Sequence, residues 1–448
     1  MKRFDGVAAG ATLKIKGNIN EADFSSYPGV GMCDNKFTGI TLKYCKSLEA
    51  LNVYINEIDT LDVSNCPNLQ ILDCSYTGIS EINLKRNPKQ ISLNCYGSQI
   101  SSLDVSKNPN LVELNAKSNL LTELNLSANH ALEYLDVQNN KHATIDVTHM
   151  KNLEQLYVNS NQLTEINVSQ NPELYILNVS DNKLKTLNVS QNLSLGKLLC
   201  ADNQIAQLNL TNQEYVFYVD CQGYKMTACA LTDLYYSLPE YPELNTPLKG
   251  HTLWVKGNNT ETTNDAEHAE SILATGKGWV INYEGDGSGC DQAYVTVIAS
   301  QNGSVEVLDA NNGKKVLSGT KVAKNSELTV KATPNAGYAV SRMTTNGKEL
   351  VDGKFTITRS TDVAVRFEVS TDINDVDAAN SNIAIAGGHC IVTVTTDQPV
   401  VVSIFTLEGK LIKQSTMDQS GKIDVSFGTY VVKTVAGNKI TSKVVGVR

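Results

Sequence analysis

The sequence predicts a solenoid of parallel strands with a small α/β cap, followed by two all-β domains. Between residues 40 and 226 an apolar residue recurs at alternating spacings of 11 and 10 residues. Beyond residue 290 apolar residues instead alternate with polar ones, which is the period of a β-strand. A unit of 21 residues cannot bury its own apolar face, so successive units must stack on one another.

The recurring residues, called anchors below, each open an apolar-x-apolar triplet such as Leu61-Asp62-Val63. Taken in pairs they define about nine coils, and each coil has a first and a second half-coil. Anchors of the first half-coils are Leu51, Leu72, Leu93, Leu114, Leu135, Leu156, Leu177, Leu198 and Val219. Anchors of the second half-coils are Ile40, Leu61, Ile82, Leu103, Leu124, Ile145, Ile166, Leu187 and Leu208.

The first half-coils follow the pattern Leu-x-x-Leu-x-Leu-x-x-Asn-x-Leu with substitutions, as in residues 111–121, where Ala116 takes the third Leu position. The pattern resembles the leucine-rich-repeat family, and this resemblance implies a parallel sheet on the concave face of the solenoid. A buried Asn is expected to bond the backbone of the turn that leaves the strand. Its position is held by Asn56, Thr77, Ser98, Asn119, Asn140, Asn161, Asn182, Asn203 and Tyr224. A second ladder is expected at Asn87, Asn108, Asn129, Asn171 and Asn192.

The residues before, between and after the first-half-coil anchors vary from coil to coil, although the buried positions are shared. We therefore expect them to be exposed, and the resemblance places them on a concave binding face. Tyrosine beside amides and carboxylates suits a protein or sugar ligand, although tyrosine is also simply common in exposed sheets. The candidate ligand-binding residues are Tyr54, Tyr96, Tyr134, Asp136, Gln138, Tyr157, Asn159, Tyr218 and Asp220.

Six of the ten cysteines fall on buried positions of the repeat, where free Cys acts as a small apolar residue. Cys74 and Cys95 would stack on neighbouring coils, but stacked side chains seldom meet disulfide geometry, so no bridge is expected there. Four cysteines lie outside the repeat, and their pairing stays open: Cys33, Cys229, Cys290 and Cys390.

The expected domains are an N-terminal cap (1–39), the solenoid (40–226), a C-terminal cap with linker (227–289) and two β domains (290–370 and 371–448). An open end of a solenoid needs a cover. Helical spacing over 231–238 and near 266–274, with a strand at 252–255, predicts that cover. Trp254 and Trp279 are expected to pack inside it, and the glycine-rich stretch 284–289 is expected to be a flexible linker.

Alternating strands are expected in the first β domain at 294–298, 303–307, 328–332, 355–358 and 363–367. The dipeptides Asn302-Gly303, Asn312-Gly313 and Asn346-Gly347 predict hairpins between them. The stretch from Gly319 to Tyr338 resembles the internalin-type B repeat, a bacterial surface module.

In the last domain, a strand–turn–strand over 400–412 precedes a Gly-x-Tyr-x-Val segment, Gly428 to Val432. This resembles the C-terminal sorting domain of the type IX secretion system of Bacteroidetes, although the segment before Gly428 is shorter than usual in that family. A plain β-sandwich stalk is the alternative. The solenoid and cap together resemble internalin-like surface proteins of Bacteroidetes, which implies a secreted or surface-displayed protein with its signal peptide removed.

The composition argues against several functions. A net charge of −9 and the absence of a Lys/Arg run disfavour nucleic acid and anionic membranes, and no apolar run has the length of a membrane span. His130, His142 and His149 are interpreted as exposed repeat variation rather than a metal site. No catalytic arrangement, metal site or cofactor is expected. The sequence therefore predicts a non-enzymatic recognition or adhesion protein that binds an extracellular protein, host or bacterial, on its concave face. Glycan capture and a passive spacer are the alternatives, and the oligomeric state stays open.

Overall fold

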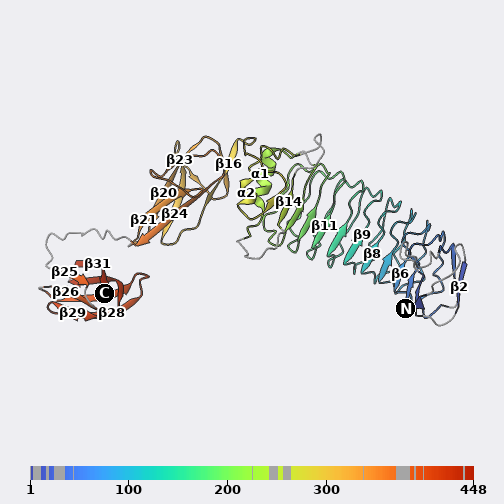
Figure 1. Cartoon of the computed structure of the whole chain (residues 1–448), viewed down its shortest axis with the longest axis horizontal. Coiled ribbons are helices and arrows are strands. Elements are labelled where there is room, and N and C mark those ends of the chain that lie inside the picture. The colour runs from blue at the N-terminus through green and yellow to red at the C-terminus, as the bar shows by residue number, and fades with distance from the viewer. Residues whose placement is uncertain are drawn as a thin grey trace. The chain divides into compact units, whose positions relative to one another are not determined.

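The computed structural model describes residues 2–3, 12–16, 20–24, 36–43, 45–223, 226–241, 251–255, 264–336, 338–369, 384–387, 390–396, 398–436 and 439–447. The chain forms two compact units, Met1–Asp291 and Gln292–Arg448. The first unit is a solenoid whose short strands stack side by side along its length (Figure 1). Cys33 and Tyr224 lie outside the described residues.

A parallel sheet of 13 strands runs through the first unit, which confirms the predicted leucine-rich-repeat solenoid. Each first half-coil contributes one three-residue strand centred on its anchor, and consecutive anchors are partners, as with Leu114 and Leu135. Its repeat strands are β5 (Ala50–Asn52), β6 (Ile71–Asp73), β7 (Ser92–Asn94), β8 (Glu113–Asn115), β9 (Tyr134–Asp136), β10 (Gln155–Tyr157), β11 (Ile176–Asn178), β12 (Lys197–Leu199) and β13 (Tyr218–Asp220).

The repeat starts earlier than residue 40. Strand β3 (Glu21–Asp23) pairs with β5 so that Ala22 faces Leu51, and β1 (Lys2–Arg3) pairs with β3. Strand β2 (Thr12–Lys16) pairs in parallel with β4 (Gly39–Lys43). The region expected to be an N-terminal cap therefore adds strands to the solenoid, and the leucine pattern did not reveal β3 because Ala22 stands where the later coils have an anchor leucine.

The predicted Asn ladder is present. Asn119 donates from Nδ2 to the carbonyls of Cys95 (2.9 Å) and Ala116 (3.1 Å), and its Oδ1 accepts the Ile100 N–H (3.0 Å). Each asparagine rung thus ties one coil to the coil before it. The residue before each rung has a left-handed backbone, with φ between 51° and 72°, at Ile55, Tyr76, Gly97, Ser118, Asn139, Ser160, Asp181, Asp202 and Gly223.

The second ladder also forms, through Nδ2 groups that donate to carbonyls of the preceding coil. Asn108 reaches Leu84 (3.2 Å) and Asn87 (2.8 Å), and Gln213 supplies a rung that the sequence reading missed. The anchors line one continuous core, with Leu124, Ile145 and Ile166 only partly buried. The ladder side chains therefore satisfy backbone groups beside this core, from which the anchors exclude water.

His142 is part of that core, so its interpretation as an exposed residue is wrong. It is 1% exposed and holds the position that Leu121 and Leu163 hold in the neighbouring coils. Burial lowers the pKa of His142, with the backbone of Thr122 opposing the shift.

The C-terminal cap extends the sheet instead of only covering it. Helix α1 (Ala228–Ser237) begins at Thr227, whose side chain accepts the Ala230 N–H, and the second helix is α2 (Ile272–Thr275). Strands β14 (Thr252–Trp254) and β15 (Val280–Ile281) continue the parallel sheet after β13. Neither helix has the length to cross a bilayer.

The two tryptophans do not pack together. Trp279 is buried and donates from Nε1 to the Pro239 carbonyl (3.0 Å), as expected for a core residue. Trp254 is 38% exposed, because its strand pairs with β13 and places Trp254 opposite Asp220. The expectation that both lie inside the cap is therefore wrong for Trp254.

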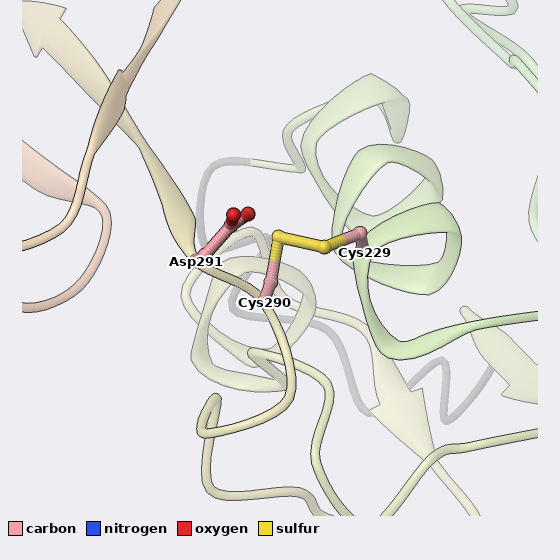
Figure 2. A group of neighbouring side chains, drawn as sticks. All are labelled: Cys229, Cys290 and Asp291. Carbon is pink, nitrogen blue, oxygen red and sulfur yellow. A yellow bond between two sulfur atoms is a disulfide. The ribbon is translucent and has the colours of Figure 1, made fainter.

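The glycine-rich stretch 284–289 is not a free linker, because it is bound to the cap. The Gly285 carbonyl accepts the Ser271 hydroxyl (2.8 Å), and the Gly287 N–H donates to Ala269 (3.0 Å). A disulfide between Cys229 on α1 and Cys290 then joins the end of this stretch to the cap (Figure 2).

The second unit contains two hydrophobic cores, and each core is packed between two sheets of mostly antiparallel strands. The first is built from β16 (Gln292–Val297), β17 (Gly303–Asp309), β18 (Lys315–Val316), β19 (Thr320–Ala323), β20 (Glu327–Pro334), β21 (Tyr338–Thr345), β22 (Lys348–Glu349), β23 (Lys354–Thr356) and β24 (Thr361–Val369). The second is built from β25 (Ala384–Gly387), β26 (Ile391–Thr395), β27 (Val400–Thr406), β28 (Leu411–Met417), β29 (Gly421–Asp424), β30 (Gly428–Ala436) and β31 (Lys439–Val447). The expected strands of both β domains are present, and only the pair β16–β24 is parallel among their described strands.

Two of the three predicted hairpins form. Asn346-Gly347 is the two-residue loop between β21 and β22, with positive φ at both residues, and Asn312-Gly313 joins β17 to β18. Asn302-Gly303 is not a hairpin, because β16 and β17 belong to different sheets and the dipeptide instead turns the chain from one sheet to the other.

Candidate functional site

The sheet face is the surface formed by the residues one before, one after and three after each first-half-coil anchor. It also includes Tyr76, whose ring packs against Tyr54 and Tyr96, and the residues Thr252 and Trp254 of β14. Strand geometry directs these side chains away from the core. All nine predicted candidates lie on it. Tyr54, Tyr96, Tyr134, Gln138, Tyr157, Asn159, Tyr218 and Asp220 are partly exposed. Asp136 is only 4% exposed, so the expectation that it projects into solvent is wrong.

Three tyrosines gather near the N-terminal end of the sheet face, and we call them the tyrosine cluster: Tyr54, Tyr76 and Tyr96. Their rings meet edge to face, with centroids 5.7 Å apart for Tyr54–Tyr76 and 4.6 Å apart for Tyr76–Tyr96. The Tyr76 and Tyr96 hydroxyls are 2.7 Å apart. Tyr76 was not predicted, because it follows the triplet and reaches the cluster only through its left-handed backbone.

A second group, Tyr134, Asp136, Gln138 and Tyr157, occupies the middle of the sheet face. Gln138 donates to Asp136 from its backbone N–H (3.0 Å) and from Nε2 (3.0 Å), while the Tyr134 hydroxyl lies 3.4 Å from Asp136 Oδ2. Burial raises the pKa of Asp136, and these hydrogen bonds oppose the shift. Burial and the Asp136 charge also raise the pKa of Tyr134 and Tyr157.

The Asp side chains of the sheet face accept hydrogen bonds from the backbone of their own turns, so their carboxylates are partly engaged. Asp136 and Asp220 each accept the N–H of the residue two positions later, and Asn52, Asp73 and Asn115 do the same in other coils. This local bond is the one that Asp62 makes to Ser64 on a second half-coil. Tyr157 has no such bond to make, so it is a better ligand candidate than Asp136.

Several exposed apolar side chains on this surface were missed by sequence reasoning. The sheet face and its edge, two residues before each anchor, expose Ile71, Tyr76, Ile91, Tyr175 and Trp254. Tyr175 and Phe217 lie with ring centroids 6.3 Å apart and flank Gly196, where an added Cβ would come 2.4 Å from the Tyr175 ring. The varying residues two before each anchor were the available signal, and Trp254 was hidden by the end of the repeat.

Negative charge dominates the sheet face and its edge. The carboxylates are Glu49, Asp73, Glu113, Glu133, Asp136, Glu154 and Asp220. The two lysines are both placed over aromatic rings: Lys117 Nζ is 5.0 Å from the Tyr96 centroid and Lys197 Nζ is 5.6 Å from that of Phe217. The surface therefore combines aromatic anchors with an acidic field.

Among the described residues, a single group brings three potential metal-ligand side chains together: Cys229, Cys290 and Asp291. Figure 2 shows the two sulfurs bonded to each other with Asp291 beside them. A sulfur engaged in a disulfide is not a thiolate donor, so this group does not offer a metal site in its oxidised state.

No protein-family model matches the sequence, and no curated protein matches it. Solved structures of similar shape include a leucine-rich-repeat protein of Leptospira interrogans, at 17% identity and a TM-score of 0.46 over 59% of this chain and 72% of that one. The functional domain of InlJ from Listeria monocytogenes, whose description notes a cysteine ladder, gives 18% identity and a TM-score of 0.39 over 75% and 79%. The internalin InlF of the same species gives 16% and 0.43 over 60% and 88%.

Proposed function

We propose that this chain is a non-enzymatic recognition protein that binds a protein partner on its sheet face. The observation that carries the proposal is the exposed aromatic set on a surface the fold does not need. Coils that share their buried anchors differ on this face, and the differences bring in Tyr76, Tyr175 and Trp254. Exposed aromatic side chains beside amides are the usual anchors of protein interfaces.

The ring geometry favours a protein partner over a glycan. Sugars stack on the open flat face of an aromatic ring, but in the tyrosine cluster the ring edges lean on neighbouring faces at interplanar angles of 78° and 63°. Such a cluster presents a ridged apolar surface that suits side chains better than a sugar ring. Because the carboxylates make the sheet face negative, the partner is expected to carry exposed Lys or Arg at its contact surface.

The disulfide supports an extracellular location. Bridges such as Cys229–Cys290 persist in oxidising compartments and are rare in the cytosol. We therefore propose a secreted or surface-displayed protein, in which the second unit serves as a spacer and a sorting or anchoring tail. Host adhesion and export by a type IX system are the most specific forms of this proposal.

A binding screen of the full-length chain tests the proposal. The chain is immobilised and exposed to extracellular proteins of host and bacterial origin and, in parallel, to a glycan array. A protein hit is then measured against Tyr54→Ala/Tyr76→Ala and against Tyr134→Ala/Tyr157→Ala. Loss of a hot-spot side chain costs about 1–2 kcal/mol or more, so affinity is expected to fall at least about tenfold in one of these variants.

The matched control is Tyr215→Ala/Phe427→Ala, since both side chains are exposed (67% and 78%) and neither lies on the sheet face. The control is expected to bind as the wild type does. A hit on the glycan array alone would favour glycan capture, and no hit in either screen would favour a passive spacer.

A further inference from the structure

The exposed turns of the second half-coils carry an excess of positive charge that the linear sequence conceals. They comprise the residues three, four, six and seven positions after each second-half-coil anchor. From Ile40 to Ile145 these positions include seven cations and no Asp or Glu: Lys43, Lys46, Lys85, Arg86, Lys89, Lys107 and Lys151. After Ile166 and the two later anchors the same positions hold no Lys or Arg and contain Glu173 and Glu214.

The solenoid brings these cations together although they are far apart in sequence. Neighbouring coils are stacked roughly 5 Å apart, so equivalent residues 21 positions apart become neighbours. Lys43, Lys46, Lys85 and Arg86 line one open hollow, whose remaining walls are Ser64, Asn65, Pro67 and Pro88. We call this run of basic turns the basic stripe.

The backbone beneath the hollow is fixed by contacts between coils. Asn68 donates from Nδ2 to the Lys46 carbonyl (2.6 Å), and Asn65 donates to the Leu42 carbonyl (3.3 Å). Further along the stripe, His149 Nε2 lies 2.8 Å from the Leu126 carbonyl, and its ring meets that of His130 edge to face at 5.2 Å. The cations therefore project from a preorganised surface.

Few carboxylates neutralise the stripe. Lys85 forms an ion pair with Asp104 at 3.5 Å. Hydrogen bonds from Ser64, and to a smaller extent the charge of Arg86, lower the pKa of Asp62. Asp62, Asp104 and Asp146 each use Oδ1 to accept a backbone N–H of their own turn, and Glu81 and Glu123 stand one residue before their anchors. Among the described residues, no carboxylate is within ion-pair distance of Lys43, Lys46, Lys107 or Lys151.

We infer that the basic stripe is a second binding site, for a linear acidic polysaccharide with carboxylate or sulfate groups. The cations occur at intervals of one or two coils, roughly 5 to 10 Å, which suits a sparsely charged polymer lying along the coil axis. Duplex nucleic acid carries a charge about every 1.7 Å. The basic turns contain one Arg and, in sequence, one aromatic residue of the Phe, Tyr and Trp types, Tyr44, so they offer no series of rings on which successive bases could stack.

The test measures binding of the full-length chain to heparin, to polygalacturonate and to neutral dextran over a series of salt concentrations. The stripe variant is Lys43→Gln/Lys46→Gln/Arg86→Gln. The control variant, Lys141→Gln/Lys183→Gln/Lys185→Gln, removes the same charge from exposed positions outside the stripe. The wild type should bind at least one of the acidic polymers and not dextran, with an affinity that falls as salt rises.

The stripe variant should lose at least about tenfold in affinity, with the salt slope lower by roughly one per cation removed, while the control changes less than about twofold. A further variant, Asp104→Asn, tests for an increase in affinity for the acidic polymer. It removes the charge that holds Lys85 but keeps the Oδ1 acceptor, and other coils already have Asn there, as at Asn83 and Asn125. This variant should bind the acidic polymer more tightly than the wild type.

Three results would overturn the inference. They are the absence of binding to both acidic polymers, equal losses in the stripe and control variants, or equally tight binding to double-stranded DNA at the same salt. Tyr54→Ala/Tyr76→Ala should bind the polymers as the wild type does, because the tyrosine cluster lies on the sheet face. The two proposed sites can therefore fail independently.

Discussion

The hydroxyls of Tyr76 and Tyr96 lie 2.7 Å apart on neighbouring coils, and their ring centroids are 4.6 Å apart. This contact depends on the residue that follows Tyr96. Gly97 has a left-handed backbone (φ 66°), and an added Cβ would lie 3.1 Å from the Tyr76 ring. Because Gly97 has no side chain, the Tyr76 ring of the preceding coil has room to pack against Tyr96.

Replacement of Gly97 by Ala should displace the Tyr76 ring and destabilise the protein by about 1 kcal/mol, because the left-handed conformation also disfavours a Cβ. The near-ultraviolet circular dichroism of the tyrosines should change. Ser118→Ala is the control, since Ser118 has the same backbone conformation and already carries a Cβ. Identical spectra for Gly97→Ala and the wild type would show that the two rings are not in contact.

An Asn of the ladder should contribute much more to the free energy of unfolding than an exposed Asn. Asn119→Ala leaves the Ile100 N–H and the Cys95 carbonyl without their buried partner and should cost roughly 1–3 kcal/mol in the free energy of unfolding. Asn152→Ala makes the same chemical change at an exposed position and should cost about 0.5 kcal/mol or less. Urea unfolding of both variants checks this, and equal midpoints would contradict the ladder.

His142 should make the protein less stable in acid. Its pKa is lowered in the folded state by burial, so the unfolded chain takes up the proton first as pH falls below about 6.5. The stability contribution of the neutral ring is thus present above that pH and is lost as pH falls toward the folded pKa. His142→Leu should lessen the loss of unfolding free energy between pH 7.5 and pH 5.5.

His268 provides the opposite case. The hydrogen bond that His268 Nδ1 donates to Asp265 Oδ1 (2.7 Å) raises the pKa of His268. Its contribution to stability is therefore present below about pH 6.5 and is lost as pH rises through the folded pKa. His268→Gln should therefore lower stability at pH 5.5 but not at pH 8.

If His142→Leu kept the full acid sensitivity of the wild type, groups other than His142 would have to be responsible for that sensitivity.

The disulfide should tie the stretch 284–289 to the cap. The double substitution Cys229→Ser/Cys290→Ser should cost about 2–4 kcal/mol, since the bridge closes a loop with a sequence separation of 61. Amide exchange around Gly287 should become faster. Peptide mapping without reduction should find the bridge, and its absence in protein made under oxidising conditions would contradict the assignment.

The other thiols offer an internal comparison. Among the described free cysteines only Cys390 is exposed, and burial raises the pKa of Cys74, Cys95 and Cys221. An alkylating agent should therefore label Cys390 quickly in the native protein and Cys74, Cys95 and Cys221 only after unfolding.

The repeat could be predicted from the sequence because a single spacing of apolar residues defines it. A period of 21 residues dictates which residues are buried, and the anchors and both Asn ladders follow from it, as Asn119 and Asn108 show. The strands of the second unit were also predictable, since their side chains alternate and the dipeptide Asn346-Gly347 supports a tight turn.

The errors occurred where a residue's surroundings come from elsewhere in the chain. Trp254 joins the sheet because β14 pairs with β13, a contact that no periodic pattern encodes. Asp136 is a different case, because the side chains that hydrogen-bond to it, Gln138 and Tyr134, are only two residues away, and the alternating pattern does not show that they cover its carboxylate. The basic stripe exists only after folding, since Lys46 and Arg86 are 40 positions apart in sequence yet line one hollow.

The affinity of the sheet-face variants for a protein found in the screen tests the central proposal most directly. Tyr54→Ala/Tyr76→Ala or Tyr134→Ala/Tyr157→Ala should bind at least about tenfold more weakly than the wild type while unfolding at the same urea concentration. Tyr215→Ala/Phe427→Ala should bind normally. A partner whose affinity survives both sheet-face variants, or falls equally in the control, would contradict recognition through this face.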